Sequence, residues 1–128
     1  MEHKPECVFE DKFFPFSTNT FSPFNSQNTF ICGSVIKDYF LFPHIGRMDD
    51  IWASYYLESL GNKVIYNKAT VYQDRNEHDL TSDFMKEIIG HKNNLQLLND
   101  LKESPANIDK YLPSRSLKAF KLYQNHFK

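Results

Sequence analysis

Apolar residues recur at helical spacing in the middle of the chain, around its only tryptophan. From Ile51 the apolar positions are 51, 52, 55, 56 and 60, which form one face of a helix. Two carboxylates, Asp49 and Asp50, stand where this helix begins, and Gly61 follows where a left-handed residue would end it. The pattern predicts a helix over residues 51–60 that opens on an acid pair.

Three other segments show a helical pattern. Residues 34–40 predict a brief helix that Ser34 can cap, and residues 116–126 predict a final helix. Between them, a helix is expected to begin at a capping Thr81, and residues 90–94 can kink or split it. The apolar stripe of this helix fits a core or an interface, and consists of Phe84, Ile88, Leu95 and Leu98.

Short β-branched and aromatic runs predict strands at residues 29–32, 63–67 and 69–72. Together with the helices they predict an α+β fold, a small mixed sheet packed with three or four helices. A sheet of so few strands would leave an edge unpaired, and this favours a homodimer formed by strand pairing or helix docking. The expected domain organisation is a polar segment over 1–12 and a single α+β domain over 13–128.

Composition indicates a globular chain of one domain, because 41% of its 128 residues are hydrophobic and 24% are charged. Nine of the twelve phenylalanines lie in residues 1–42, so this segment must supply much of the core. The net charge of −1 argues against a general nucleic-acid binder. Residues 110–128 carry five basic and no acidic side chains, which suit either a phosphate or acidic partner or the solvated face of a last helix.

Neither a signal peptide nor a membrane span of about 20 apolar residues is recognisable in the sequence. Cys7 and Cys32 have no metal-binding or redox spacing, so we expect free thiols in a reducing, cytoplasmic compartment. The chain also lacks a P-loop, a GxGxxG, an HExxH, a CxxC and a GxSxG motif. These absences disfavour a serine or cysteine hydrolase.

Candidate chemistry is confined to polar residues in loops that follow strands or precede helices. The amide cluster of residues 25–28 suits sugar hydroxyls or a nucleotide base, or a loop that bonds its own backbone. Acids with a histidine can bind a divalent metal or divide acid and base roles, although acid pairs at helix starts also serve as caps. The candidate residues are Asn25, Gln27, Asn28, His44, Arg47, Asp49, Asp50, Asp74, Arg75, His78 and Asp79.

The order of three motifs resembles a known enzyme family. The stretch from Pro23 to Phe30, the Asp-Ile-Trp triplet at residues 50–52 and the polar loop of residues 73–79 resemble the C-terminal half of STELLO-like glycosyltransferases. Residues 46–53 are also similar to plant reversibly glycosylated polypeptides, the UDP-arabinopyranose mutase family. Both belong with the GT-A nucleotide-sugar enzymes. The resemblance covers residues 14–90 and leaves 91–128 as a helical tail.

The resemblance implies a role for particular residues. Asp50 would be the general base that deprotonates an acceptor hydroxyl, and Asp49 would be its neighbour and a substrate hydrogen-bond partner. Trp52 would pack behind the acid or offer its face to a sugar ring. His78 would bind a divalent metal, Mn²⁺ or Mg²⁺, or the diphosphate. Phosphate would be met by Arg47 or Arg75, while Asn25, Gln27 and Asn28 would contact substrate.

The chain departs from the GT-A pattern because it contains no Asp-x-Asp motif, which in those enzymes holds the metal and the donor diphosphate. We therefore expect a glycosyltransferase portion that requires a separate N-terminal nucleotide-binding half, with a nucleotide sugar and a carbohydrate acceptor as partners. Two alternatives from other classes stay open. One is a non-catalytic carbohydrate- or nucleotide-binding module, and the other is a small oligomeric interaction protein with an exposed aromatic segment.

Overall fold

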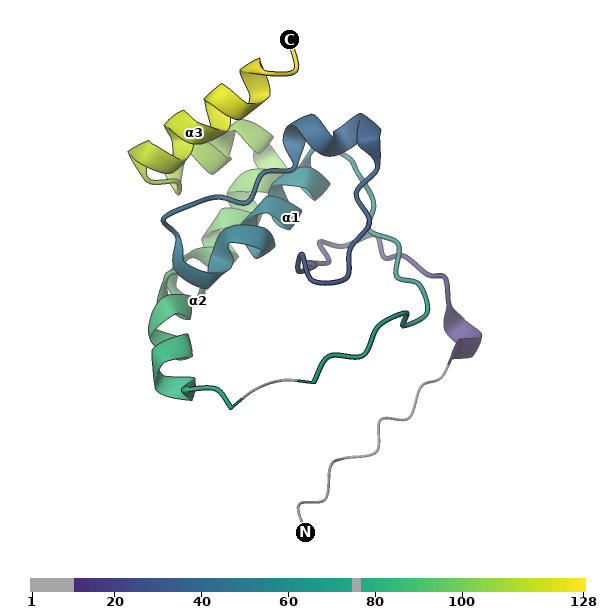
Figure 1. Cartoon of the computed structure of the whole chain (residues 1–128). Coiled ribbons are helices and arrows are strands. Elements are labelled where there is room, and N and C mark those ends of the chain that lie inside the picture. Colours follow the sequence, from purple (N-terminus) through teal and green to yellow (C-terminus); the bar gives the residue numbers. More distant parts are fainter. Residues whose placement is uncertain (1–10, 75–76) are drawn as a thin grey trace.

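The computed structural model describes residues 11–74 and 77–128, so most of the predicted polar segment over 1–12 lies outside the described residues. Of these residues, 56% are helical and 2% pair as strand. The α-helices are α1 (Asp49–Ser59), α2 (Leu80–Glu103) and α3 (Ser114–Asn125), as Figure 1 shows. Shorter 3-10 helices are η1 (Asp11–Phe13), η2 (Gly33–Asp38), η3 (Gly46–Met48) and η4 (Pro105–Lys110).

The predicted α+β fold with a small mixed sheet is wrong. Within residues 11–74 and 77–128 the strand pairing is limited to one antiparallel bridge, between Phe16 and Tyr66. Their backbones exchange hydrogen bonds of 3.0 and 2.8 Å, and their rings stack with centroids 5.3 Å apart. The runs expected to be strands are otherwise irregular.

Exposure explains why these runs do not form a sheet. Ile65, Val71 and Tyr72 all have well over half of their surface open to solvent. A short strand pair is stable when one of its faces is buried against another layer, and none of the helices in the described part of the chain covers this segment. The β propensity of these residues is therefore not sufficient to form a sheet, because their side chains do not pack against another layer.

The core forms around α1, where every residue from Trp52 to Leu57 is buried. Its polar start fits the prediction, since Asp49 and Asp50 occupy the first turn. Its end also fits, because Gly61 follows with φ +89° and donates its amide to the carbonyl of Glu58 at 2.9 Å. A helix buried on nearly all sides has to be central to the fold.

Segments from both sides of α1 in the sequence complete this core. Phe42 precedes the helix and meets Phe120 of α3 edge to face, with ring centroids 5.1 Å apart. Leu97 and Leu101 enter from α2, and Ile108 enters from η4. The other buried hydrophobic residues are Ile45, Trp52, Ala53, Tyr55, Tyr56, Leu57 and Leu112.

Helix α2 runs without interruption for 24 residues, so the predicted break at residues 90–94 is wrong. Gly90 is buried there, and a Cβ atom added to it would lie 2.2 Å from the sulfur of Met48. The glycine therefore permits close packing and does not end the helix. The cap also differs from the expected Thr81, because the Asp79 carboxylate accepts the amides of Thr81 and Ser82 at 3.0 and 3.2 Å.

The two remaining helical predictions are close to the structure. The final helix, expected over 116–126, is α3 and begins two residues earlier. The brief helix expected over 34–40 is the 3-10 helix η2, which makes no side-chain cap bond at its start. Ser34 lies inside η2 and does not cap it.

Candidate functional site

The acid pair and the amide-rich loop lie together at the start of α1. Asp50 Oδ2 accepts hydrogen bonds from the backbone amide of Ser26 at 2.9 Å and from its hydroxyl at 3.2 Å. These bonds bring together two segments that the resemblance places in one site. They also occupy one oxygen of the carboxylate proposed as a base, so Asp50 anchors the loop.

Most polar groups of this loop bond to the protein itself. Asn25 Oδ1 accepts the amide of Gln27 at 3.2 Å, and the Asn25 carbonyl accepts the Thr29 hydroxyl at 2.5 Å. Asn28 donates to the hydroxyl of Thr70 at 3.2 Å, which ties the loop to the segment after α1. Such bonds are those of a loop that stitches its own backbone. Gln27 is exposed beside them.

Tyr39 is a neighbour of the acid pair that the sequence did not indicate. Burial raises the pKa of Tyr39 to about 12, and the charges of Asp50 and Asp49 act in the same direction. Its hydroxyl is buried with no hydrogen-bond partner among the described residues, and its ring stacks on Phe24 at 5.7 Å. Tyr39 therefore stays neutral and closes the apolar side of the site.

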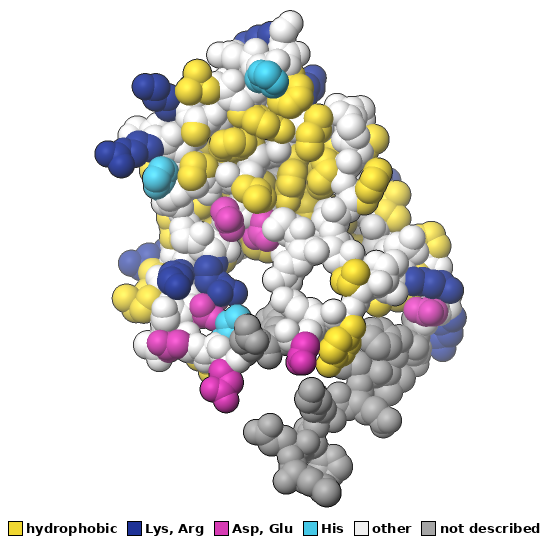
Figure 2. All heavy atoms as spheres, in the orientation of Figure 1, with side chains coloured by type: hydrophobic (Ala, Val, Ile, Leu, Met, Phe, Trp, Pro, Cys, Tyr) yellow, Lys and Arg dark blue, Asp and Glu magenta, His cyan; other side chains and the backbone are white. Residues whose placement is uncertain are grey.

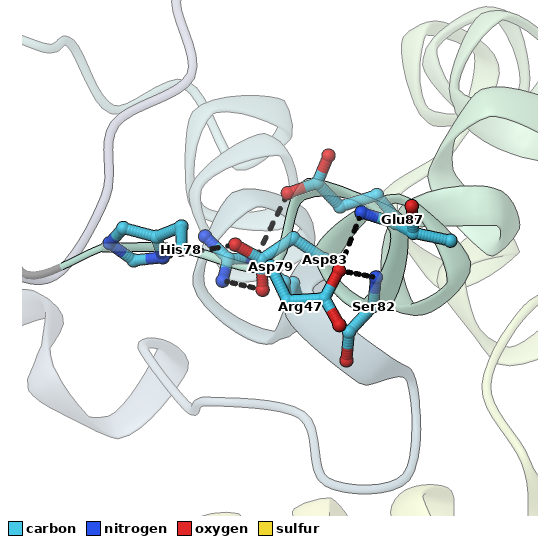
Figure 3. A network of polar contacts seen from close by, with 7 residues as sticks. Arg47, His78, Asp79, Ser82, Asp83 and Glu87 are labelled. Carbon is cyan, nitrogen blue, oxygen red and sulfur yellow. Dashed lines mark hydrogen bonds and ion pairs between the residues drawn. The ribbon is translucent and has the colours of Figure 1, made fainter.

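Arg47 and His78 belong to a different group, shown in Figure 3. Arg47 holds two acids of α2, because its terminal nitrogen lies 2.9 Å from Asp83 and its Nε lies 2.9 Å from Glu87. His78 Nδ1 lies 3.0 Å from the other oxygen of Asp83. Among the described residues, these charged contacts run to α2 and none reaches the acid pair at the start of α1.

The sequence offered one signal for this group. Asp83 and Glu87 are four residues apart, on one side of the first turns of α2, where carboxylates suit the helix dipole. It could not show that Arg47 reaches them. With its guanidinium paired, Arg47 fastens η3 to α2, and exposed pairs of this kind contribute about 0–1 kcal/mol each.

The described residues contain no group of three or more His, Cys, Asp or Glu side chains that could hold a metal ion. His78 sits beside the Arg47 guanidinium, whose positive charge opposes a cation there. The role of His78 as a ligand of Mn²⁺ or Mg²⁺ stays a prediction, and Arg75 lies outside the described residues.

Trp52 is fully buried, and its indole N–H donates to Asn94 Oδ1 on α2 at 2.8 Å. Of the two roles considered for it, the structure provides packing: no face of the ring is open to a sugar. His44 lies apart from both polar groups, with φ +67°, on the rim of an open groove of about 440 Å³ beside α2.

Glu58, in the last turn of α1, was not recognised from the sequence. One of its oxygens accepts the amide of Ser22 at 2.8 Å, and the other is buried with no partner among the described residues. Burial raises the pKa of Glu58 above its ordinary value, and the Ser22 bond opposes this shift. The carboxyl group borders a cavity of about 210 Å³ lined also by Thr18, Thr20 and Lys63.

Comparisons with known proteins give no relative for this chain, since no protein family, curated protein or solved structure matches it. None of the helices formed by the described residues combines the length and the apolar character needed to cross a bilayer. Helix α2 has the length, but polar and charged residues interrupt it throughout.

Proposed function

We propose that the chain is an interaction module, a small helical protein that binds another protein through apolar side chains left exposed by its own fold. The observation that carries this proposal is the number of such side chains: among residues 11–74 and 77–128, fifteen large hydrophobic residues are exposed, against twelve hydrophobic residues that are buried. The exposed ones are Phe13, Phe16, Phe30, Ile36, Leu41, Leu60, Ile65, Val71, Tyr72, Leu80, Phe84, Met85, Leu95, Leu122 and Phe127.

Single exposed hydrophobic residues are ordinary, but groups of them mark interaction surfaces. Figure 2 shows hydrophobic side chains at the surface over the helical part of the molecule. Phe30, in the irregular N-terminal part, is 94% exposed, and Leu95, in the middle of α2, is 78% exposed. Neither residue contributes to the core, so binding to a partner is the function that accounts for them best.

A binding measurement with surface variants tests this proposal. Full-length protein immobilised on a sensor should bind the protein fraction of a cell extract, or its own chain, in a saturable manner. A Phe30→Ser, Leu95→Gln variant should lose that binding. A control variant with two exposed polar changes on α3, Lys118→Gln and Asn125→Ser, should keep it. Equal binding by all three proteins, or none by the wild type, would contradict the proposal.

A second candidate is the acceptor-side portion of a nucleotide-sugar glycosyltransferase. It is favoured by the contact between Asp50 and the loop of residues 25–28, which unites two of the three segments that carry the family resemblance. To act as a base, Asp50 would use Oδ1 or release Ser26. A metal, Mn²⁺ or Mg²⁺, would have to meet His78 at Nε2, because Nδ1 faces Asp83.

This candidate requires a nucleotide-binding half supplied by another chain or segment. In a reconstituted enzyme with a UDP-sugar and a carbohydrate acceptor, Asp50→Asn should abolish transfer. Retained turnover would remove Asp50 as the base. Because Asp50 also anchors the loop, the affinity for the acceptor must be measured on the same variant.

A cytoplasmic location is part of the proposal. Cys32 is a free and exposed thiol, which a reducing compartment would preserve. Fractionation of cells that express the tagged chain, followed by thiol labelling of Cys32, tests the location. Recovery of an oxidised Cys32 from a secretory fraction would contradict it.

A further inference from the structure

Helix α2 carries a stripe of four apolar residues and one histidine with the spacing of a coiled-coil seam. Its positions alternate in steps of four and three residues, which is the heptad pattern. In heptad terms Ile88 and Leu95 are a positions, and Phe84, His91 and Leu98 are d positions. The stripe consists of Phe84, Ile88, His91, Leu95 and Leu98.

Most of this stripe does not serve the core of its own chain, and Leu98 is the member that packs against that core. Leu95, Phe84 and His91 are exposed, while Ile88 and Leu98 are half-buried. The buried residues Leu97 and Leu101 lie on a different side of the helix. The rings of Phe84 and His91 pack together with centroids 5.4 Å apart, so part of the stripe is already ordered as one surface.

We infer that α2 pairs with α2 of a second copy of this chain, in a parallel, in-register homodimer. The residues that flank the stripe carry this choice of partner. In a parallel pair each g position faces the e position five residues later in the other helix. Glu87 then meets Lys92 of the second copy, and Leu80 meets its Met85.

Both flanking pairs match in kind, because one joins opposite charges and the other joins two apolar side chains. The charge match is self-complementary, because a two-fold axis repeats the Glu87–Lys92 pair on both sides of the seam. An antiparallel pair would set the Glu87 side of one helix against the same side of the other and forfeit the charge pair. The Arg47 contact uses only Oε1 of Glu87.

This inference rests on the proposed function, since it names the partner of one exposed surface. It also replaces the route to a homodimer expected from the sequence, because the described residues form no sheet whose edge could pair. Four apolar layers and one histidine layer make a short seam, so the dimer should exchange reversibly with the monomer.

Sedimentation equilibrium of the full chain across micromolar to millimolar concentrations tests the dimer. The wild type should show a reversible monomer–dimer equilibrium, and Leu95→Lys should be monomeric. Leu122→Lys is the matched control, because Leu122 is an exposed leucine on α3, outside the stripe. Circular dichroism should show both variants folded, since each replaces a side chain that is open to solvent.

Charge reversal tests the register. Glu87→Lys and Lys92→Glu should each weaken dimerisation by about tenfold, because attraction between the helices becomes repulsion on both sides of the seam. The double swap, made in an Arg47→Gln background because Arg47 pairs with Glu87 in the same chain, should restore the dissociation constant of the Arg47→Gln protein. In a Cys7→Ser, Cys32→Ser background, His91→Cys should form an interchain disulfide, which a parallel in-register pair permits.

A strictly monomeric wild type would overturn the inference. So would a dimer that Leu95→Lys leaves unchanged, or one in which the charge swap does not restore binding. Failure here is distinguishable from failure of the interaction proposal: a monomer that still binds another protein through Phe30 and Leu95 keeps the proposed function and removes only the second copy as the partner.

Discussion

The contact between Asp50 and Ser26 leads to a prediction that separates a structural role of the acid pair from a catalytic one. Asp49 and Asp50 share the first turn of α1 and its helix dipole, but only Asp50 accepts bonds from the loop, at 2.9 and 3.2 Å. Asp49→Asn and Asp50→Asn therefore each remove one negative charge from the start of α1. Asp50→Asn also weakens the two hydrogen bonds that hold the loop of residues 25–28.

The magnitudes follow from these contacts. Loss of one negative charge near a helix start costs about 0.3–1 kcal/mol, which is the whole effect expected for Asp49→Asn. Asp50→Asn keeps an acceptor oxygen but turns two charge-assisted bonds into neutral ones, which adds about 1 kcal/mol. For a chain of this size, the melting temperature should fall by about 2 °C for Asp49→Asn and by about 3–6 °C for Asp50→Asn.

Two measurements check this prediction. Differential scanning calorimetry gives the melting temperatures, and hydrogen exchange followed by NMR gives the protection of the Ser26 amide. Protection should fall in Asp50→Asn and stay unchanged in Asp49→Asn. Equal melting temperatures and equal protection in the two variants would refute the reasoning that Asp50 holds the loop.

Three other predictions concern the core, a turn and a buried acid. Leu97→Ala should lower the free energy of unfolding by about 2–5 kcal/mol in urea denaturation, because Leu97 is fully buried. Gly46→Ala should destabilise the chain by more than about 1 kcal/mol by the same assay, because Gly46 has φ +65° and its Cβ would lie 2.2 Å from the Lys86 carbonyl oxygen. Glu58→Gln should gain stability relative to wild type as the pH rises, as paired thermal melts can show, because the raised pKa of Glu58 favours its protonated form in the folded state.

The sign of the Glu58 effect follows from its raised pKa. The folded state binds a proton more tightly than the unfolded state does, so this group stabilises the protein most at pH values below the ordinary glutamate pKa. That contribution is lost as the pH rises through the raised pKa. Glutamine does not titrate, and its amide oxygen can still accept the Ser22 amide. A constant difference between variant and wild type from pH 4 to pH 8 would contradict the assignment.

Local signals in the sequence were sufficient to predict where α1 begins and ends. An acid pair starts it and Gly61 ends it, and both depend on interactions within a few residues. The prediction of a break in α2 was wrong because Gly90 was interpreted as a helix breaker. Its actual role depends on Met48, a residue 42 positions away that packs against it.

The prediction of a sheet was wrong for a related reason. The runs near Tyr66 and Tyr72 have strand-like composition, but a sheet also needs a covering layer, and the apolar residues that could form one pack around α1 instead. The family resemblance put the segments of Asp50 and Ser26 in one site, but it did not predict the bonds between these two residues. The bonds of Arg47 to α2 depend on long-range packing, which no local pattern in the sequence reveals.

The pairing of the α2 stripe with that of a second copy is tested most directly by methyl NMR spectra of the full chain at increasing protein concentration. The methyl resonances of Ile88, Leu95 and Leu98 should shift together along one binding curve, while those of Leu122 on α3 stay in place. Resonances of the stripe that remain constant up to millimolar concentration would contradict the account.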